Sequence, residues 1–198
     1  MDALNEGFVV WLTGLSGAGK TTIALALEPE LRKRGVRSER LDGDTVREGL
    51  TRDLGFSKED RDKNIERVGF VAKLLSRNGV GVIASFISPY RAAREKLRAE
   101  TTNFIEIYVA APVEACAARD VKGLYAKAFA GQLTGFTGVN DPYEAPEHPE
   151  LILHTEHESV AESVAIILNY LEARGLIPEA LTPDKHSQTE DEYVAIIR

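Results

Sequence analysis

The stretch Gly14-Leu15-Ser16-Gly17-Ala18-Gly19-Lys20-Thr21 separates two segments whose residues follow different patterns. Before it, residues 8–12 form a short apolar run of the kind that favours a β-strand. After it, Ile23, Leu27 and Leu31 recur at the spacing of one helical face. A strand, a glycine-rich turn and a helix together form the context in which the pattern G-x-x-x-x-G-K-[ST] predicts phosphate binding.

The predicted phosphate loop has a simple physical basis. Its glycines permit backbone angles that other residues avoid, so successive N–H groups can point into one concavity, at a helix N-terminus that attracts anions. Lys20 is expected to reach the outer phosphates as a catalytic residue, and the Thr21 hydroxyl to bind Mg²⁺. The alternative is a glycine turn that only links strand to helix, and the complete pattern disfavours it. The predicted nucleotide-binding residues are Gly14, Leu15, Ser16, Gly17, Ala18, Gly19, Lys20, Thr21 and Thr22.

The composition limits the classes of protein that remain open. A chain of 198 residues suits one well-buried α/β core, and a formal net charge of −7 gives no reason to expect a nucleic-acid partner. The single cysteine, Cys116, cannot form an intrachain disulfide, which suits a reducing compartment. Because we find no leader and no apolar run near membrane-spanning length, we expect a cytoplasmic protein without a membrane partner.

Strand-like and helix-like segments alternate along the chain. Helical spacing is clearest over residues 58–78, which Ser57 is expected to cap, and a second apolar stripe runs from Val160 to Leu171. The strand-like runs cover residues 8–12, 38–41, 80–85, 104–109 and 151–154. This alternation predicts an α/β fold with a parallel sheet covered by helices on both faces, and ligands at the carboxyl ends of its strands.

The chain divides into a domain and a tail. We assign residues 1–177 to the domain and residues 178–198 to a polar tail. The tail is either a loose arm or, through residues 193–197, an added edge strand or a docking segment.

Two carboxylates follow the second predicted strand. Asp42 and Asp44 could hold Mg²⁺ through water or accept a proton from an acceptor hydroxyl. The alternative is a turn aspartate followed by a helix N-cap at Asp44. Several arginines expected at the same rim favour an anion pocket, because converging guanidinium groups recognise phosphate. These arginines are Arg47, Arg52, Arg61 and Arg91.

The third predicted strand runs into Ser88 and Pro89. The structural interpretation places Ser88 at the N-cap of a helix that Pro89 opens. The functional interpretation places Ser88 in contact with a substrate at the end of the strand.

Seven segments in order resemble those of the adenylylsulfate (APS) kinases. They are residues 14–20 (GLSGAGK), 41–44 (LDGD), 53–61 (DLGFSKEDR), 85–91 (SFISPYR), 122–125 (KGLY), 136–138 (FTG) and 142–146 (PYEAP). The likeness covers about residues 7–175 and implies a P-loop, nucleotide-kinase-like fold with a five-stranded parallel sheet and a lid at about residues 121–140. It implies transfer of the ATP γ-phosphoryl group to the 3′-hydroxyl of adenosine 5′-phosphosulfate, in sulfate assimilation, by a homodimer.

The resemblance also implies roles for single residues. Asp44 is expected near Mg²⁺ and the 3′-hydroxyl, as general base or metal-water ligand. Phe56 and Phe136 are expected to enclose the APS adenine, although core packing is the alternative for each ring. Arg119 is expected against the ATP adenine. The remaining predicted APS contacts, with Lys122 and Lys127 in the lid, are Arg47, Arg61, Asn64, Ile87, Ser88, Lys122 and Lys127.

The serine that matches Ser88 is described in the family as a phosphoryl acceptor. Direct in-line transfer needs no such step, and no base is evident beside Ser88, so we keep it as an active-site residue without a covalent role. The chain departs from the family pattern at Thr45, Val121 and Phe129. Two rival functions remain: a kinase for gluconate or a nucleoside monophosphate, and a nucleotide switch. The paired phenylalanines favour an adenine-bearing acceptor.

Overall fold

One sheet of five parallel strands lies at the centre of the structure, a computed structural model that describes residues 6–179. In chain order the strands are β1 (Val9–Thr13), β2 (Ser38–Asp42), β3 (Gly81–Ser85), β4 (Phe104–Ala110) and β5 (Leu151–His154). They lie in the order β2-β3-β1-β4-β5, and all neighbours are parallel. This confirms the predicted fold class. The tail segment 193–197 lies outside the described residues.

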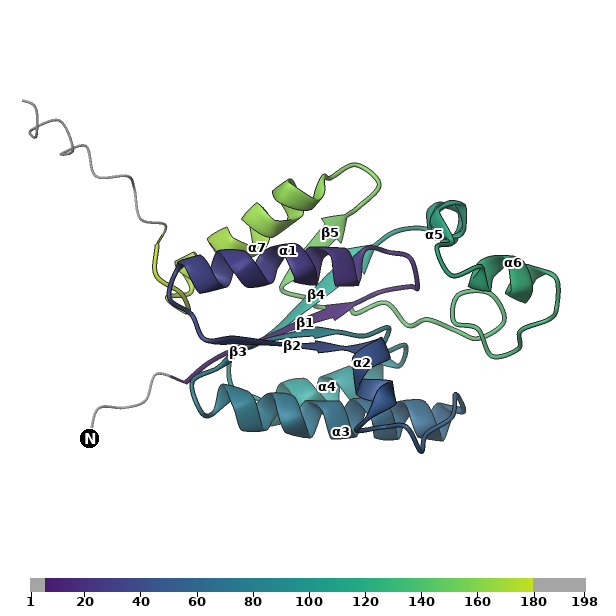
Figure 1. Ribbon diagram of the computed structural model, residues 1–198, viewed down its shortest axis with the longest axis horizontal. Coiled ribbons are helices and arrows are strands. Elements are labelled where there is room, and N and C mark those ends of the chain that lie inside the picture. The colour runs from purple at the N-terminus through teal and green to yellow at the C-terminus, as the bar shows by residue number, and fades with distance from the viewer. Residues whose placement is uncertain (1–5, 180–198) are drawn as a thin grey trace, which may run out of the picture.

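Helices cover both faces of this sheet (Figure 1). They are α1 (Lys20–Lys33), α2 (Gly43–Glu48), α3 (Lys58–Ser76), α4 (Arg91–Glu100), α5 (Val113–Arg119), α6 (Leu124–Phe129) and α7 (Val160–Ala173). α1 and α7 lie on one face and α3 and α4 on the other, while α5 and α6 lie beyond the carboxyl ends of the strands (Figure 1). None of the helices described is both long enough and apolar enough to span a bilayer.

The alternation of side chains along β1 divides the core into two layers. Val10 and Leu12 pack with the apolar stripes of α1 and α7, whereas Val9 and Trp11 pack with α3 and α4. All residues of β1 are buried, as expected for the central strand of a parallel sheet covered on both faces. The core therefore fixes β1, and β1 carries the phosphate loop at its carboxyl end.

The helix caps decide how the chain enters the site. Ser57 caps α3 as predicted, because its side chain accepts a hydrogen bond from the Asp60 N–H. Two alternative interpretations are wrong. Asp42, not Asp44, caps α2, and α4 begins at Arg91 with Tyr90 at its N-cap, so Ser88 is no cap and Pro89 does not open the helix.

Candidate active site

The phosphate loop is a cradle of backbone groups between β1 and α1. At Gly14, φ is +149°, and a Cβ would lie 2.5 Å from the Val109 carbonyl oxygen, so no other residue fits there. The Lys20 side chain folds back over the loop, and its Nζ donates to the carbonyl oxygens of Gly14 at 2.9 Å and Leu15 at 2.7 Å. Burial lowers the pKa of Lys20 to about 8. A phosphate bound in the cradle would place negative charge beside Lys20 and so favour its ammonium form.

The carboxylate that contacts the phosphate loop is Asp42. The Thr21 hydroxyl donates to Asp42 Oδ2 at 2.9 Å, which leaves the oxygen lone pairs of Thr21 free for a cation. Asp42 Oδ1 accepts from the N–H of Asp44 at 3.0 Å and so begins α2. A hydroxyl beside a carboxylate at a phosphate loop is a donor set that suits Mg²⁺. Both Asp42 and Asp44 follow the second predicted strand, and the phosphate-loop pattern and the family resemblance assigned the metal to Thr21 and Asp44, whereas in the structure Asp42 is the carboxylate that contacts Thr21.

Asp44, two residues after Asp42, lies in the first turn of α2 and contacts the expected lid segment. Lys122 Nζ donates to Asp44 Oδ2 at 2.5 Å, and both side chains are more than half exposed. This ion pair joins α2 to a segment 78 positions later in the chain. The Asp44 carboxylate is therefore held at the rim of the site, beside a lysine that the sequence analysis expected to face phosphate.

The two predicted aromatic walls differ in burial. Phe56 is 67% exposed, and the guanidinium of Arg47 lies 4.2 Å from the centroid of its ring. Phe136 is 8% exposed and packs edge-on against Tyr125, with ring centroids 4.9 Å apart. Phe136 thus packs against the core through Tyr125, whereas Phe56 is exposed.

Arg61 joins the loops that carry the two walls. Its Nε donates to the carbonyl oxygen of Phe56 at 2.8 Å. Its two terminal nitrogens donate to the Gly135 carbonyl oxygen and the Thr137 hydroxyl, the residues on either side of Phe136. An ion pair of 3.5 Å with Asp141 completes the set. One partly buried guanidinium therefore connects the Phe56 and Phe136 loops.

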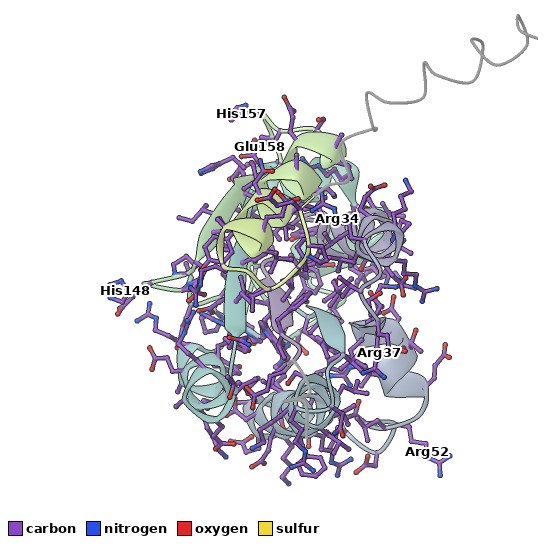
Figure 2. The ribbon with its side chains drawn as sticks, turned by 90° about the vertical axis from the view of Figure 1, so that its left-hand side faces the viewer. Arg34, Arg37, Arg52, His148, His157 and Glu158 are labelled. Carbon is purple, nitrogen blue, oxygen red and sulfur yellow. The ribbon has the colours of Figure 1, made fainter. Side chains whose placement is uncertain are left out.

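The other arginines do not all join this group. Arg47 donates to the carbonyl oxygens of Leu54 and Gly55 and stays beside Phe56. Arg52 points away from the body of the molecule (Figure 2). Arg91 instead pairs with Glu147 at 2.6 Å. The expected convergence of four arginines is therefore wrong for Arg52 and Arg91.

Asn64 is buried on α3, and its Oδ1 has no hydrogen-bond partner among the residues described. An unpaired buried acceptor lowers the stability of the fold unless a ligand or water donates to it.

The two other predicted basic contacts lie at the surface and at the phosphate loop. Lys127 is exposed, and Arg119 donates to the Thr155 carbonyl oxygen at 2.7 Å and to the Gly17 carbonyl oxygen at 3.3 Å. Arg119 thus lies against the phosphate loop.

Ser88 belongs to a buried hydrogen-bond chain. Its Oγ accepts from Trp11 Nε1 at 3.1 Å and donates to Thr13 Oγ1 at 2.9 Å. Thr13 in turn donates to the Ile87 carbonyl oxygen at 2.7 Å, so the hydroxyl of Tyr143, 3.0 Å away, must donate to Thr13. Ser88 is 2% exposed, with φ of +40°. The Ser88 hydroxyl proton is donated to Thr13, and among residues 6–179 no carboxylate or imidazole contacts the Ser88 oxygen.

A buried ion-pair network that was not predicted from the sequence contacts the backbone of Ser88. Arg94 Nε donates to Glu106 Oε1 at 2.6 Å, and its terminal nitrogens donate to the carbonyl oxygens of Ser88 and Glu144. Arg98 donates to the second oxygen of Glu106 at 3.0 Å. The network fixes the loop after β3 against the segment that carries Tyr143. In the sequence, this network is indicated only by the spacing of Arg94 and Arg98, which lie four residues apart and so on one face of α4.

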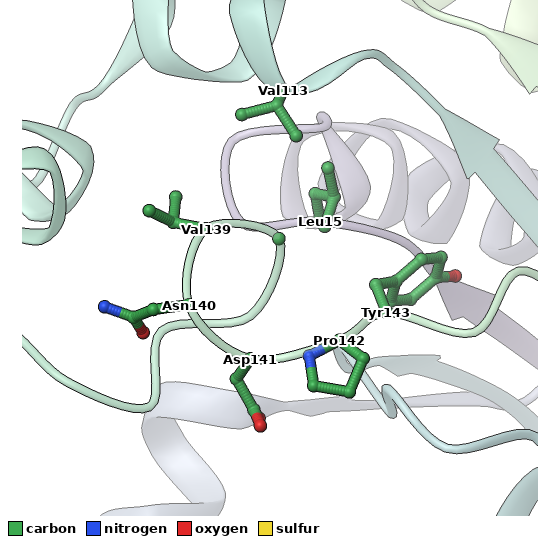
Figure 3. Close-up of a pocket in the computed structure, with 8 residues that line it drawn as sticks. Leu15, Val113, Val139, Asn140, Asp141, Pro142 and Tyr143 are labelled. Carbon is green, nitrogen blue, oxygen red and sulfur yellow. The ribbon is translucent and has the colours of Figure 1, made fainter.

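A pocket of about 650 Å³ lies between the phosphate loop and residues 138–143 (Figure 3). Its lining residues are Leu15, Val113, Gly138, Val139, Asn140, Asp141, Pro142 and Tyr143. Among the residues expected to bind nucleotide, metal or acceptor, Leu15 alone lines this pocket. The pocket therefore lies beside the candidate active site.

Sequence relatives identify the family. Residues 6–154 match the family described as Adenylylsulphate kinase. A probable adenylyl-sulfate kinase of Pseudomonas aeruginosa is 67% identical over 164 residues, which are 83% of this chain and 77% of the relative. An adenylyl-sulfate kinase of Halothermothrix orenii is 57% identical over 172 residues, which are 87% of this chain and 93% of the relative.

Solved structures agree with the sequence relatives. The APS kinase CysC of Mycobacterium tuberculosis, in complex with AMPPNP and APS, has a TM-score of 0.80 and 42% identity, covering 84% of this chain and 98% of that chain. Shikimate kinase of Aquifex aeolicus shares the fold, with a TM-score of 0.50 and 16% identity, covering 85% of this chain and 99% of that chain. The chain belongs to the adenylylsulphate kinase family.

Proposed function

We propose that this chain binds ATP with Mg²⁺ in the phosphate loop and transfers the γ-phosphoryl group to the 3′-hydroxyl of adenosine 5′-phosphosulfate. The products are 3′-phosphoadenosine 5′-phosphosulfate and ADP. The observation that carries the proposal is Arg61, because one guanidinium holds the Phe56 and Phe136 loops together beside α2, which bears Asp44 and Arg47. A planar base fits between two rings, and a sugar acid does not need them.

The donor side supplies charge and alignment. Backbone N–H groups and Lys20 hold the phosphates, and the Lys20 ammonium is favoured once a phosphate neutralises it. Thr21 and Asp42 would hold Mg²⁺, which neutralises phosphate charge when bound. Arg119 lies against the phosphate loop, which supports the expected contact with the ATP base.

The acceptor side supplies a proton acceptor in the right place. Asp44 lies on α2 between Asp42, which contacts the phosphate loop, and Arg47, which lies beside Phe56, and from there its carboxylate can accept the proton of the 3′-hydroxyl. Lys122 from the proposed lid, residues 121–140, reaches the same point and can neutralise charge as the phosphoryl group crosses. Arg47, Asn64 and Lys127 remain the proposed contacts of the phosphosulfate and ribose.

Transfer is direct in this proposal. Ser88 donates its proton to Thr13 and is buried, so an attack by its oxygen on a phosphorus atom would require breaking that hydrogen bond without a base to take the proton. Ser88 then stabilises the conformation of the loop after β3, and Ile87 of the same loop remains a proposed contact of the acceptor.

We also expect a homodimer, and light scattering on the purified chain would measure its mass.

The test is steady-state release of ADP with three acceptors at equal concentration: APS, AMP and gluconate. We expect kcat/KM to be largest with APS and the reaction to yield the 3′-phosphorylated product. Faster ADP release with AMP would favour a nucleoside monophosphate kinase, and faster release with gluconate would favour a sugar-acid kinase. ADP release that no acceptor stimulates would favour a nucleotide switch.

A further inference from the structure

Ser85 is the last residue of β3, and within residues 6–179 its side-chain hydroxyl has no hydrogen-bond partner. The residue is 4% exposed, and its Oγ has no partner. In the sheet register, Ser85 lies between Leu12 on β1 and Asp42 on β2. The unpaired hydroxyl therefore lies at the carboxyl edge of the sheet, one strand away from the carboxylate that contacts the phosphate loop.

The direction of the Ser85 side chain follows from its neighbours. Residues paired across parallel strands point to the same face, and alternate residues of one strand do so as well. Leu12 and Ile83 both pack in the core layer under α1. Asp42 also points to this face, because Thr21 of α1 donates to it at 2.9 Å. Ser85 thus shares the face of Asp42 and Thr21.

A buried hydroxyl without a partner destabilises a folded protein, and native structures hold few of them. Such a group is explained when a ligand or a bound water satisfies it. The phosphate loop, Thr21 and Asp42 already form a donor set that suits Mg²⁺, and a metal of this kind keeps several waters when it binds a nucleotide. The position of Ser85 therefore matches the outer part of a hydrated metal site.

We propose that Ser85 is a further residue of the metal–nucleotide site, where its Oγ hydrogen-bonds to a water of the Mg²⁺ coordination shell beside Asp42. The proposal rests on the metal site proposed above, and it assigns Ser85 a positioning role toward that water. It does not depend on the identity of the acceptor, because Mg²⁺ and ADP alone test it.

The chain offers a matched control. Ser38 is the first residue of β2, on the same face as Asp42 by alternation, and its Oγ is likewise buried without a partner. Ser38 lies at the opposite end of the strand, away from the phosphate loop. Ser38→Ala and Ser85→Ala therefore remove the same kind of group at two distances from the metal site.

The experiment measures the thermal midpoint and the ADP dissociation constant of the wild-type chain, Ser85→Ala and Ser38→Ala, in EDTA and in Mg²⁺. We expect both substitutions to raise the thermal midpoint without ligand, because each removes an unpaired buried hydroxyl. With Mg²⁺, only Ser85→Ala should weaken ADP binding, by about three- to tenfold, the loss of one hydrogen bond. In EDTA, both variants should bind ADP like the wild type.

Three results would overturn the proposal. Ser85→Ala binding Mg²⁺–ADP as tightly as the wild type would show that Ser85 plays no part in the site. Equal weakening in EDTA and Mg²⁺ would show a structural effect on the loop. Wild-type binding that is the same with and without Mg²⁺ would overturn the metal site together with the role of Ser85. APS turnover is measured separately, so failure here leaves the proposed reaction standing.

Discussion

The proposed donor side and the proposed acceptor side of the candidate active site are built in different ways. The phosphate loop is continuous in sequence, and its hydrogen bonds with Lys20 join residues five and six positions apart. The acceptor side joins distant segments, with Arg61 reaching residues 74 and 76 positions later and Lys122 pairing with Asp44 across 78 positions. The ligand cradle of the phosphate loop is therefore made of residues that are neighbours in sequence, whereas the proposed acceptor site is made of segments that only the fold brings together.

This difference explains what the sequence could predict. The phosphate loop, the five strands and the Ser57 cap depend on neighbours in the chain, and their patterns predicted them within a residue or two. The Arg61 contacts, the buried Arg94–Glu106 pair and the left-handed backbone at Ser88 depend on partners far along the chain. The sequence could not decide between Asp42 and Asp44 as the carboxylate at the metal, because only the placement of β2 beside α1 selects the one that contacts Thr21.

The largest expected effect is at the junction of the two sides. Asp44→Asn should lower kcat about 10²- to 10⁴-fold, because it removes the proposed proton acceptor, and should leave the KM for ATP nearly unchanged. Steady-state kinetics with ATP and APS measure it. Asp62→Asn is the control, since Asp62 is also a carboxylate paired with a lysine, at 2.7 Å from Lys58 on α3. Turnover of Asp44→Asn within tenfold of the wild type would exclude the base role.

Removing one aromatic wall should affect the acceptor side alone. Phe56→Ala should raise the KM for APS about 5- to 150-fold, the range expected for loss of base stacking, without changing the KM for ATP. Phe70→Ala on α3 is a close control, because Phe70 is 63% exposed and Phe56 is 67% exposed. Equal changes for both substrates, or equal changes in the two variants, would separate Phe56 from the acceptor site.

The donor side should show a pH dependence of its own. Burial lowers the pKa of Lys20 to about 8, and a bound phosphate favours the ammonium form, so ADP binding should take up a proton near pH 8. Affinity should then fall by up to about tenfold per pH unit above 8. Without ligand the sign reverses: the cost of the buried charge is present below pH 8 and is relieved as pH rises.

Titration calorimetry of ADP in two buffers that differ in ionisation enthalpy measures this proton uptake. Binding without uptake at pH 8, or affinity that does not change between pH 7 and pH 9, would show that Lys20 stays charged in the free protein.

The smallest effect on turnover is expected at Ser88. Ser88→Ala should keep kcat within about tenfold of the wild type, because the proposed transfer is direct and leaves Ser88 only the support of a loop. It should lower stability by about 1–3 kcal/mol, since the Trp11 N–H loses its partner. Thermal unfolding and single-turnover kinetics measure the two effects. Loss of turnover by several orders of magnitude in a folded variant would restore the covalent step.

A crystal structure of the chain with a non-hydrolysable ATP analogue, Mg²⁺ and APS would test the two-sided site most directly. We predict that the APS adenine lies between the rings of Phe56 and Phe136, with its 3′-oxygen within hydrogen-bond distance of Asp44. An adenine bound away from these rings, or an Asp44 carboxylate turned away from both the metal and the 3′-oxygen, would contradict the account.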